Sequence, residues 1–188
     1  MLIICIMFVV GSFLRSGALF TPRMPVCGRR KAFSSLRMEA AQVVVKQGKA
    51  RLFQAGNPLI YSGAIEKVYN NPQAGDEVNV IDTKGNAIGR GYFNPHSQYR
   101  VRLLVSKEED KLMRADLEEV LVTRIRNAMS LRAACNLPNA ETTAYRLING
   151  EGDRLSGLIV DVLGQAMVIQ SSAYWVEANR AVVERAVQ

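Results

Sequence analysis

Short β-type runs separated by turn residues at spacings of roughly ten limit the fold of residues 43–106 more than any other feature. The runs are VVVKQG, NPLIYSGAIEKVY, DEVNVIDTKGNAIGRGYFN and YRVRLLVS. Lys84-Gly85-Asn86 predicts the turn of a β-hairpin. Alternation along YRVRLLV predicts a core face and an opposite face that carries cations: Tyr99, Val101, Leu103 and Val105 against Arg100, Arg102 and Leu104. We therefore expect a small domain rich in strands at 41–106.

A second pattern begins at Glu108. The residues up to Cys135 contain no Gly or Pro and place apolar side chains at helical spacing, which predicts an amphipathic helix with a possible break near Ala115-Asp116. TTAYRLIN, LIVDVLG and QAMVIQSS then predict three strands, and AYWVEANRAVVERAVQ predicts a closing helix that packs Trp175 against a sheet. The fold class is therefore α+β, with a small α/β domain at 107–188. Its closing helix has an apolar stripe with nothing after it, so we expect the domain to be incomplete at its C-terminus.

The first 40 residues have the composition of a leader. Residues 1–38 contain six basic residues and no acid, and Ser is frequent among them, which is typical of an organellar transit peptide. The opening MLIICIMFVV lacks the basic segment that precedes the apolar stretch of a secretory signal. We expect an organellar protein, in the chloroplast before the mitochondrion, with secretion or membrane anchoring through the first 20 residues as the alternative. No apolar run reaches the roughly 18 residues that a spanning helix needs, so we expect no membrane partner.

The net charge of +7 suggests a nucleic-acid partner, but its distribution is uneven. Residues 41–115 contain 11 basic and 7 acidic side chains, whereas residues 116–188 contain 7 and 9. Only the first domain can attract phosphate by its net charge.

The stretch NGEGDRLSGLIVDVLGQ, from Asn149, resembles a ligand loop but fails two tests. In a phosphate loop the residue after Gly157 would be Lys, and it is Leu158. In a calcium loop Arg154 would be Gly and Val160 would be Glu. We therefore expect a turn whose charged residues cap or pair locally.

No catalytic, cofactor or metal residues are predicted. The three cysteines have no paired spacing, and His96, in a loop, is the only histidine. Gly89-Arg90-Gly91 is not followed by a helical pattern, which a dinucleotide fingerprint requires. No nucleophile has an evident base.

Three segments together resemble the ribosomal RNA large subunit methyltransferase I family: NPLIYSGAIEKV, GDEVNVIDTKGNAIGRGYFNPHSQYRVRLL and YRLINGEGDRLSGLIVDVLGQAMVIQ. The resemblance covers about residues 43–188. It implies a small PUA-type β-barrel domain that binds RNA, then a small α/β linker domain, and then a Rossmann-type domain, absent here, that uses S-adenosylmethionine to methylate C5 of a cytosine in 23S rRNA. No cysteine of this chain lies where the family's nucleophile would, and no cofactor is expected in this chain.

The resemblance and the charge pattern suggest RNA contacts in the first domain. Gly63 lies in a turn where a PUA domain lets backbone approach RNA, although a plain turn explains it equally well. One of Tyr92 and Phe93 could stack on a base while the other is core. The candidate RNA-binding residues are Lys46, Lys49, Arg51, Ser62, Gly63, Ala64, Tyr92, Arg100 and Arg102.

The function that these features predict is the RNA-binding and linker portion of an rRNA cytosine-C5 methyltransferase, with ribosomal RNA as partner. The alternative is a stand-alone RNA-binding or ribosome-assembly factor. A homodimer is an expectation from the resemblance alone.

Overall fold

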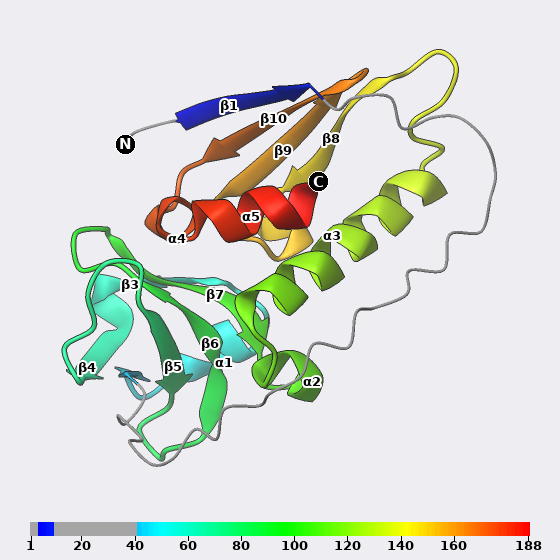
Figure 1. Ribbon diagram of the computed structural model, residues 1–188. Helices are drawn as coiled ribbons and strands as arrows, with labels where there is room; N and C mark the ends of the chain where they lie inside the picture. Colours follow the sequence, from blue (N-terminus) through cyan, green and yellow to red (C-terminus); the bar gives the residue numbers. More distant parts are fainter. Residues whose placement is uncertain (1–3, 10–40) are drawn as a thin grey trace, which may run out of the picture.

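The computed structural model describes residues 4–9 and 41–188, which form two units joined by one long strand (Figure 1). The first unit, residues 41–106, is a curled six-stranded sheet of order β3-β7-β6-β5-β2-β4, in which only β2 and β5 run parallel. Its elements are β2 (Gln42–Val45), α1 (Ala50–Gln54), β3 (Leu59–Tyr61), the 3₁₀ turn η1 (Ser62–Ala64), β4 (Ile65–Tyr69), β5 (Glu77–Ile81), β6 (Ala87–Phe93) and β7 (Tyr99–Ser106). The expected α+β class is confirmed.

The predicted hairpin is present between β5 and β6. Its turn is stabilised by Asp82, whose Oδ1 accepts hydrogen bonds from the backbone N of Lys84 and of Asn86, both at 2.8 Å. Inside β6, a Cβ on Gly89 or Gly91 would collide with a backbone carbonyl of β7, at Val105 or Arg102 respectively. These two glycines therefore allow β7 to lie close against β6.

Strand β7 has the predicted bounds, but its faces differ from the simple alternation. Its pairing with β6 shifts register between Leu103 and Val105, because Leu104 is an extra residue in the ladder. Leu103 lies in the core of the first unit, whereas Leu104 and Val105 both lie in the core of the second. Tyr99, expected in the core, is 44% exposed because the strand begins beyond the core's edge. The two units thus share one strand.

The second unit packs helices on one face of a four-stranded antiparallel sheet of order β1-β10-β9-β8 (Figure 1). The predicted helix is interrupted where expected, and Asp116 caps the longer part by accepting a hydrogen bond from the backbone N of Glu119 at 2.8 Å. The elements are α2 (Asp110–Met113), α3 (Leu117–Ala134), β8 (Ala144–Asn149), η2 (Gly150–Asp153), β9 (Leu158–Leu163), β10 (Ala166–Ser171), α4 (Tyr174–Ala178) and α5 (Arg180–Val187).

The closing helix is divided into two. The chain leaves helical geometry at Asn179 (φ −116°, ψ 26°), whose side-chain amide donates to the carbonyl of Trp175 at 2.8 Å. Trp175 is 2% exposed, and its ring N–H donates to the carbonyl of Ser156 at 2.9 Å, which confirms its expected place in the core.

Part of the expected leader lies in the second sheet. Residues Ile4–Val9 form strand β1, which pairs antiparallel with β10, so the sheet includes a segment that the sequence analysis left outside the fold. The rest of the leader, residues 1–3 and 10–40, lies outside the described residues, and its targeting role stays a prediction. None of the helices in the described part is both long and apolar enough to cross a membrane.

Candidate nucleic-acid interface

The turn η1 is exposed at its centre and held at both ends. The backbone N of Ser62 donates to the carbonyl of Gln98 at 2.9 Å, and the backbone N of Lys46 donates to the carbonyl of Ala64 at 2.9 Å. The ammonium of Lys46 also donates to the carbonyl of Gly63 at 2.8 Å. Ala64 has no exposed surface, whereas Ser62 and Gly63 are exposed. The turn is fixed in shape and open on its outer side.

Gly63 differs from the two glycines of β6. A Cβ at this position would have only a Tyr61 ring carbon within 4 Å, at an ordinary contact distance of 3.8 Å, and the backbone has no positive φ here. Neither packing nor backbone conformation within the described chain requires glycine. Its lack of a side chain instead leaves the turn free for close approach by another molecule.

Four cations contact this turn or lie close in the chain to residues that contact it: Lys46 binds it directly, and Lys49, Arg51 and Arg100 lie a few residues from Lys46 or Gln98. The first three side chains are exposed and Arg100 is partly exposed. Lys49 and Arg51 lie at the start of α1, which follows β2, and Arg100 follows the loop that η1 contacts through Gln98. Within residues 4–9 and 41–188, none of the four forms an ion pair. Unpaired cations beside an open backbone turn suit a phosphate backbone.

Tyr99 adds an aromatic ring to the same surface, and the sequence analysis did not select it. The residue follows Gln98 directly and pairs in register with Tyr61, the last residue before η1. The guanidinium carbon of Arg102 lies 5.7 Å from the centre of the Tyr99 ring. We call the η1 turn, the four cations and Tyr99 the η1 surface.

Arg102 and Tyr92, two of the predicted RNA contacts, face the second unit instead. The Nη1 of Arg102 donates to Glu151 Oε1 at 3.1 Å and to Ser156 Oγ at 2.9 Å. Burial lowers the pKa of Arg102 from its usual value, while the charge of Glu151 opposes that change. Tyr92 stacks on Trp175 with ring centres 5.5 Å apart, and burial raises the pKa of Tyr92 to about 12. Of the neighbouring residues Tyr92 and Phe93, Phe93 is the one that lies in the core of the first unit.

We call this junction, together with the paired arginines of helix α3 in the second unit, the seam, and three further paired arginines belong to it. Arg90 donates to the carbonyls of Leu112 and Ala115 at 2.9 and 2.7 Å, between the two units. Arg124, 4% exposed, makes two 2.7 Å hydrogen bonds to the Glu109 carboxylate. Arg132 makes two 2.7 Å bonds to Asp153 in η2. The seam therefore uses its cations to hold backbone and carboxylates, which leaves them unsuited to bind phosphate.

The stretch NGEGDR forms the predicted turn, and Asp153 caps it locally by accepting a hydrogen bond from the backbone N of Asn149 at 2.6 Å. Its charged side chains also form ion pairs over long sequence distances, which the local pattern does not predict. Glu151 pairs with Arg102, Asp153 with Arg132, and Arg154 with Glu109 at 3.3 Å. Arg154 itself adopts left-handed backbone geometry (φ 59°) at the end of η2. Through the pair of Glu151 with Arg102, the stretch joins the two units.

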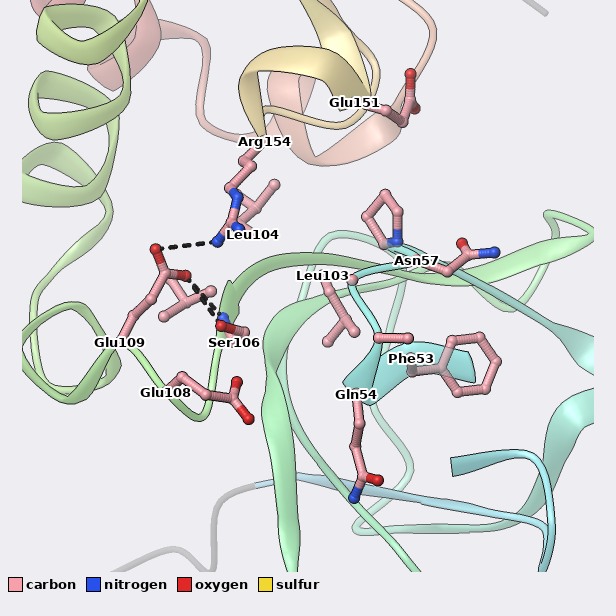
Figure 2. Close-up of a pocket in the computed structure, with 14 residues that line it drawn as sticks. Phe53, Gln54, Asn57, Leu103, Leu104, Ser106, Glu108, Glu109, Glu151 and Arg154 are labelled. Atoms are coloured by element: carbon pink, nitrogen blue, oxygen red, sulfur yellow. Dashed lines mark hydrogen bonds and ion pairs between the residues drawn. The ribbon is translucent and has the colours of Figure 1, made fainter. Parts of the chain in front are cut away.

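A cleft of about 400 Å³ opens between α1, the end of β7 and η2 (Figure 2). Figure 2 shows Arg154 extending from the loop after η2 to Glu109. Glu108, which also lines the cleft, is exposed. Burial alone would raise the pKa of Glu109, but hydrogen bonds from Arg124 and the backbone of Ser106, together with the charges of Arg124 and Arg154, lower its pKa to about 2. A cleft lined by three carboxylates and one arginine repels phosphate.

The described residues offer no catalytic or metal constellation. They contain no group of three or more His, Cys, Asp or Glu side chains that could hold a metal ion. His96 is exposed in the β6–β7 loop, where its backbone N donates to Asn94 Oδ1, and Cys135 is an exposed free thiol.

The comparisons with known proteins agree with this division into two units. A family model for a PUA-like domain matches residues 43–106. Ribosomal RNA large subunit methyltransferase I of Alteromonas mediterranea is 29% identical over 131 residues, which cover 70% of this chain and 32% of the relative. The protein of the same name from Shewanella frigidimarina is 33% identical over 132 residues, again 70% of this chain and 32% of the relative. The chain thus spans about a third of the length of these relatives.

Solved structures show the same arrangement of the fold. A candidate SAM-dependent methyltransferase from Streptococcus mutans superposes with a TM-score of 0.62 at 19% identity, covering 78% of this chain and 36% of that one. A structure of a candidate methyltransferase in complex with SAH gives the same values. At this identity the likeness establishes the fold of the two units and no more.

Proposed function

We propose that this chain, a homologue of the N-terminal third of ribosomal RNA large subunit methyltransferase I, is the RNA-binding and linker portion of an rRNA methyltransferase. The observation that carries the proposal is the η1 surface. Three cations without a partner in the described chain, Lys49, Arg51 and Arg100, occur on the PUA-like unit together with an open glycine turn that Lys46 binds, whereas the seam arginines are all occupied. In this proposal the first unit binds ribosomal RNA and the second unit holds it at a fixed offset from the methyl-transfer site.

Methyl transfer to C5 of a cytosine, with S-adenosylmethionine as donor, is assigned to the part of the protein that corresponds to the rest of the relatives' length. The residues described here do not fit that cofactor, because Gly89 and Gly91 lie inside β6 and lead into no helix. No residue of this chain is therefore given a cofactor or catalytic role.

The organellar destination is a further proposal, supported by the acid-free, arginine-rich residues 1–38. Residues 1–40 fused to a fluorescent protein should direct it to plastids. A diffuse signal, or one in mitochondria or the secretory pathway, would contradict the plastid assignment.

RNA binding is tested with the whole chain and a structured fragment of large-subunit rRNA, by filter binding at a series of salt concentrations. The variant Lys49→Gln/Arg100→Gln should weaken binding roughly tenfold, because each charge that faces a phosphate contributes a charge-assisted contact. The matched control is Lys84→Gln/Lys111→Gln, which removes two equally unpaired charges from the hairpin tip and from α2. Absence of binding at low salt, or equal weakening by both variants, would contradict the proposal.

A further inference from the structure

We infer that Tyr99 is a stacking platform for an unpaired base, so that the RNA recognised by the η1 surface is single-stranded where it contacts Tyr99. The inference rests on the proposed function, and it adds the structural class of the RNA. It starts from the exposure of Tyr99, which is 44% despite a position in a strand whose following odd-numbered side chains are buried.

The Tyr99 ring is exposed and yet backed by the protein. The guanidinium of Arg102 lies on it at 5.7 Å, and that guanidinium is in turn fixed by Glu151 and Ser156 of the second unit. A ring held in this way loses little conformational freedom when a base stacks on its open side. Bases stack on aromatic side chains in proteins that bind single-stranded nucleic acid, and the contact is tolerant of sequence.

The surroundings of Tyr99 supply the other parts of such a site. The η1 turn is joined to Gln98, the residue before Tyr99, by the Ser62 N to Gln98 O hydrogen bond, so the open backbone of η1 lies near the ring, and Arg100 follows Tyr99 directly in β7. On the seam side, a hollow of about 30 Å³ is lined by Asn94, Ser97, Tyr99, Arg102 and Ser172, among others. This volume holds about one water molecule. A base therefore stacks on the Tyr99 ring without being enclosed by the hollow, and only a substituent on the edge of the base can enter the hollow.

This geometry excludes duplex RNA from the platform. In an A-form helix each base face is covered by its neighbours, so a protein ring cannot stack on it without unstacking the helix. In a single strand or a loop the face of a base is free to stack on Tyr99, and the cations of the η1 surface can then contact the phosphates of the same strand.

The test compares a single-stranded RNA 12-mer, with 2-aminopurine at one internal position, and the same strand paired with its complement. The wild-type chain should bind the single strand at least tenfold more tightly and quench the 2-aminopurine fluorescence on binding. Tyr99→Ala should weaken single-strand binding roughly 5- to 100-fold and abolish the quenching, whereas Tyr99→Phe keeps both.

The matched control is Tyr69→Ala. Tyr69 is exposed to 41% and has the Lys67 ammonium 4.5 Å from its ring centre, but it lies at the end of β4 away from η1. Its removal should leave binding and quenching unchanged. Equal affinity for single strand and duplex, with no effect of Tyr99→Ala, would overturn the platform and leave RNA binding in place. Failure of both RNAs to bind at low salt would overturn the proposed function and the platform together.

Discussion

The η1 surface and the seam contain the same residue types in different states of pairing. At the seam, Arg90, Arg102, Arg124 and Arg132 each have carboxylate or carbonyl partners from another segment. At the η1 surface, Lys49, Arg51 and Arg100 have none within the described chain. An arginine's role is therefore decided by whether the fold brings an acceptor to it, and net charge alone does not locate a binding surface.

The largest effect is expected from Glu109→Gln at the seam. Arg124 would keep its charge in a buried position without a carboxylate, and breaking such a pair destabilises a fold by ~3 kcal/mol. Urea unfolding measures the loss. Glu108→Gln, one residue away and exposed, is the control and should change the free energy of unfolding by less than ~0.5 kcal/mol. Equal effects of the two variants would mean that the Glu109 pair does not stabilise the seam.

The Glu109 carboxylate should also make the free energy of unfolding depend on pH. The pKa of Glu109 is lowered to about 2 in the folded protein from its ordinary 4.5. A group whose pKa is lower in the folded than in the unfolded protein stabilises the fold fully at pH values above its unfolded pKa. The contribution of Glu109, ~3 kcal/mol at most, should therefore be lost as the pH falls from about 4.5 toward 2. Glu109→Gln should flatten that part of the profile. Wild-type and variant profiles that run parallel below pH 4.5 would contradict the assignment.

Alanine substitutions at Gly91 and Gly63 distinguish a glycine that packing requires from one that lies in the η1 surface. Gly91→Ala places a Cβ against the carbonyl of Arg102 and should destabilise the first unit by ~2 kcal/mol. Gly63→Ala meets only Tyr61 at 3.8 Å and should leave thermal unfolding within ~0.5 kcal/mol of wild type while weakening RNA binding. A Gly63→Ala chain that binds RNA normally would remove the turn from the interface.

Local patterns predicted most of the elements, and long-range pairing explains what they could not predict. The β5–β6 hairpin, the break before α3 and the strands β8–β10 follow from periodicity and turn residues, which act within a few positions. The sharing of β7 between two cores depends on one extra residue at Leu104, and no local signal marks it. Arg102 was predicted to contact RNA because no local pattern indicates its partner, Glu151, which lies 49 positions away in the sequence.

The candidate site was predicted only in part for the same reason. The cations around η1 followed from charge and from the family resemblance, whereas Tyr99 was assigned to the core because strict alternation extends a pattern beyond the point where the core ends. Tyr92 was predicted to contact RNA, but it packs inside the protein, because its stacking partner Trp175 comes from a helix far away in the sequence.

The salt dependence of RNA affinity for two single variants, Arg100→Gln and Arg102→Gln, tests most directly whether unpaired cations bind RNA while paired cations hold the units together. The slope of log Kd against log salt should fall by about 0.7 for Arg100→Gln, because one phosphate contact to a single strand is lost. Arg102→Gln should leave the slope unchanged and lower the free energy of unfolding by ~1 kcal/mol, because its ion pair with Glu151 is partly exposed. A slope that falls equally for both variants, or only for Arg102→Gln, would contradict this division between the η1 surface and the seam.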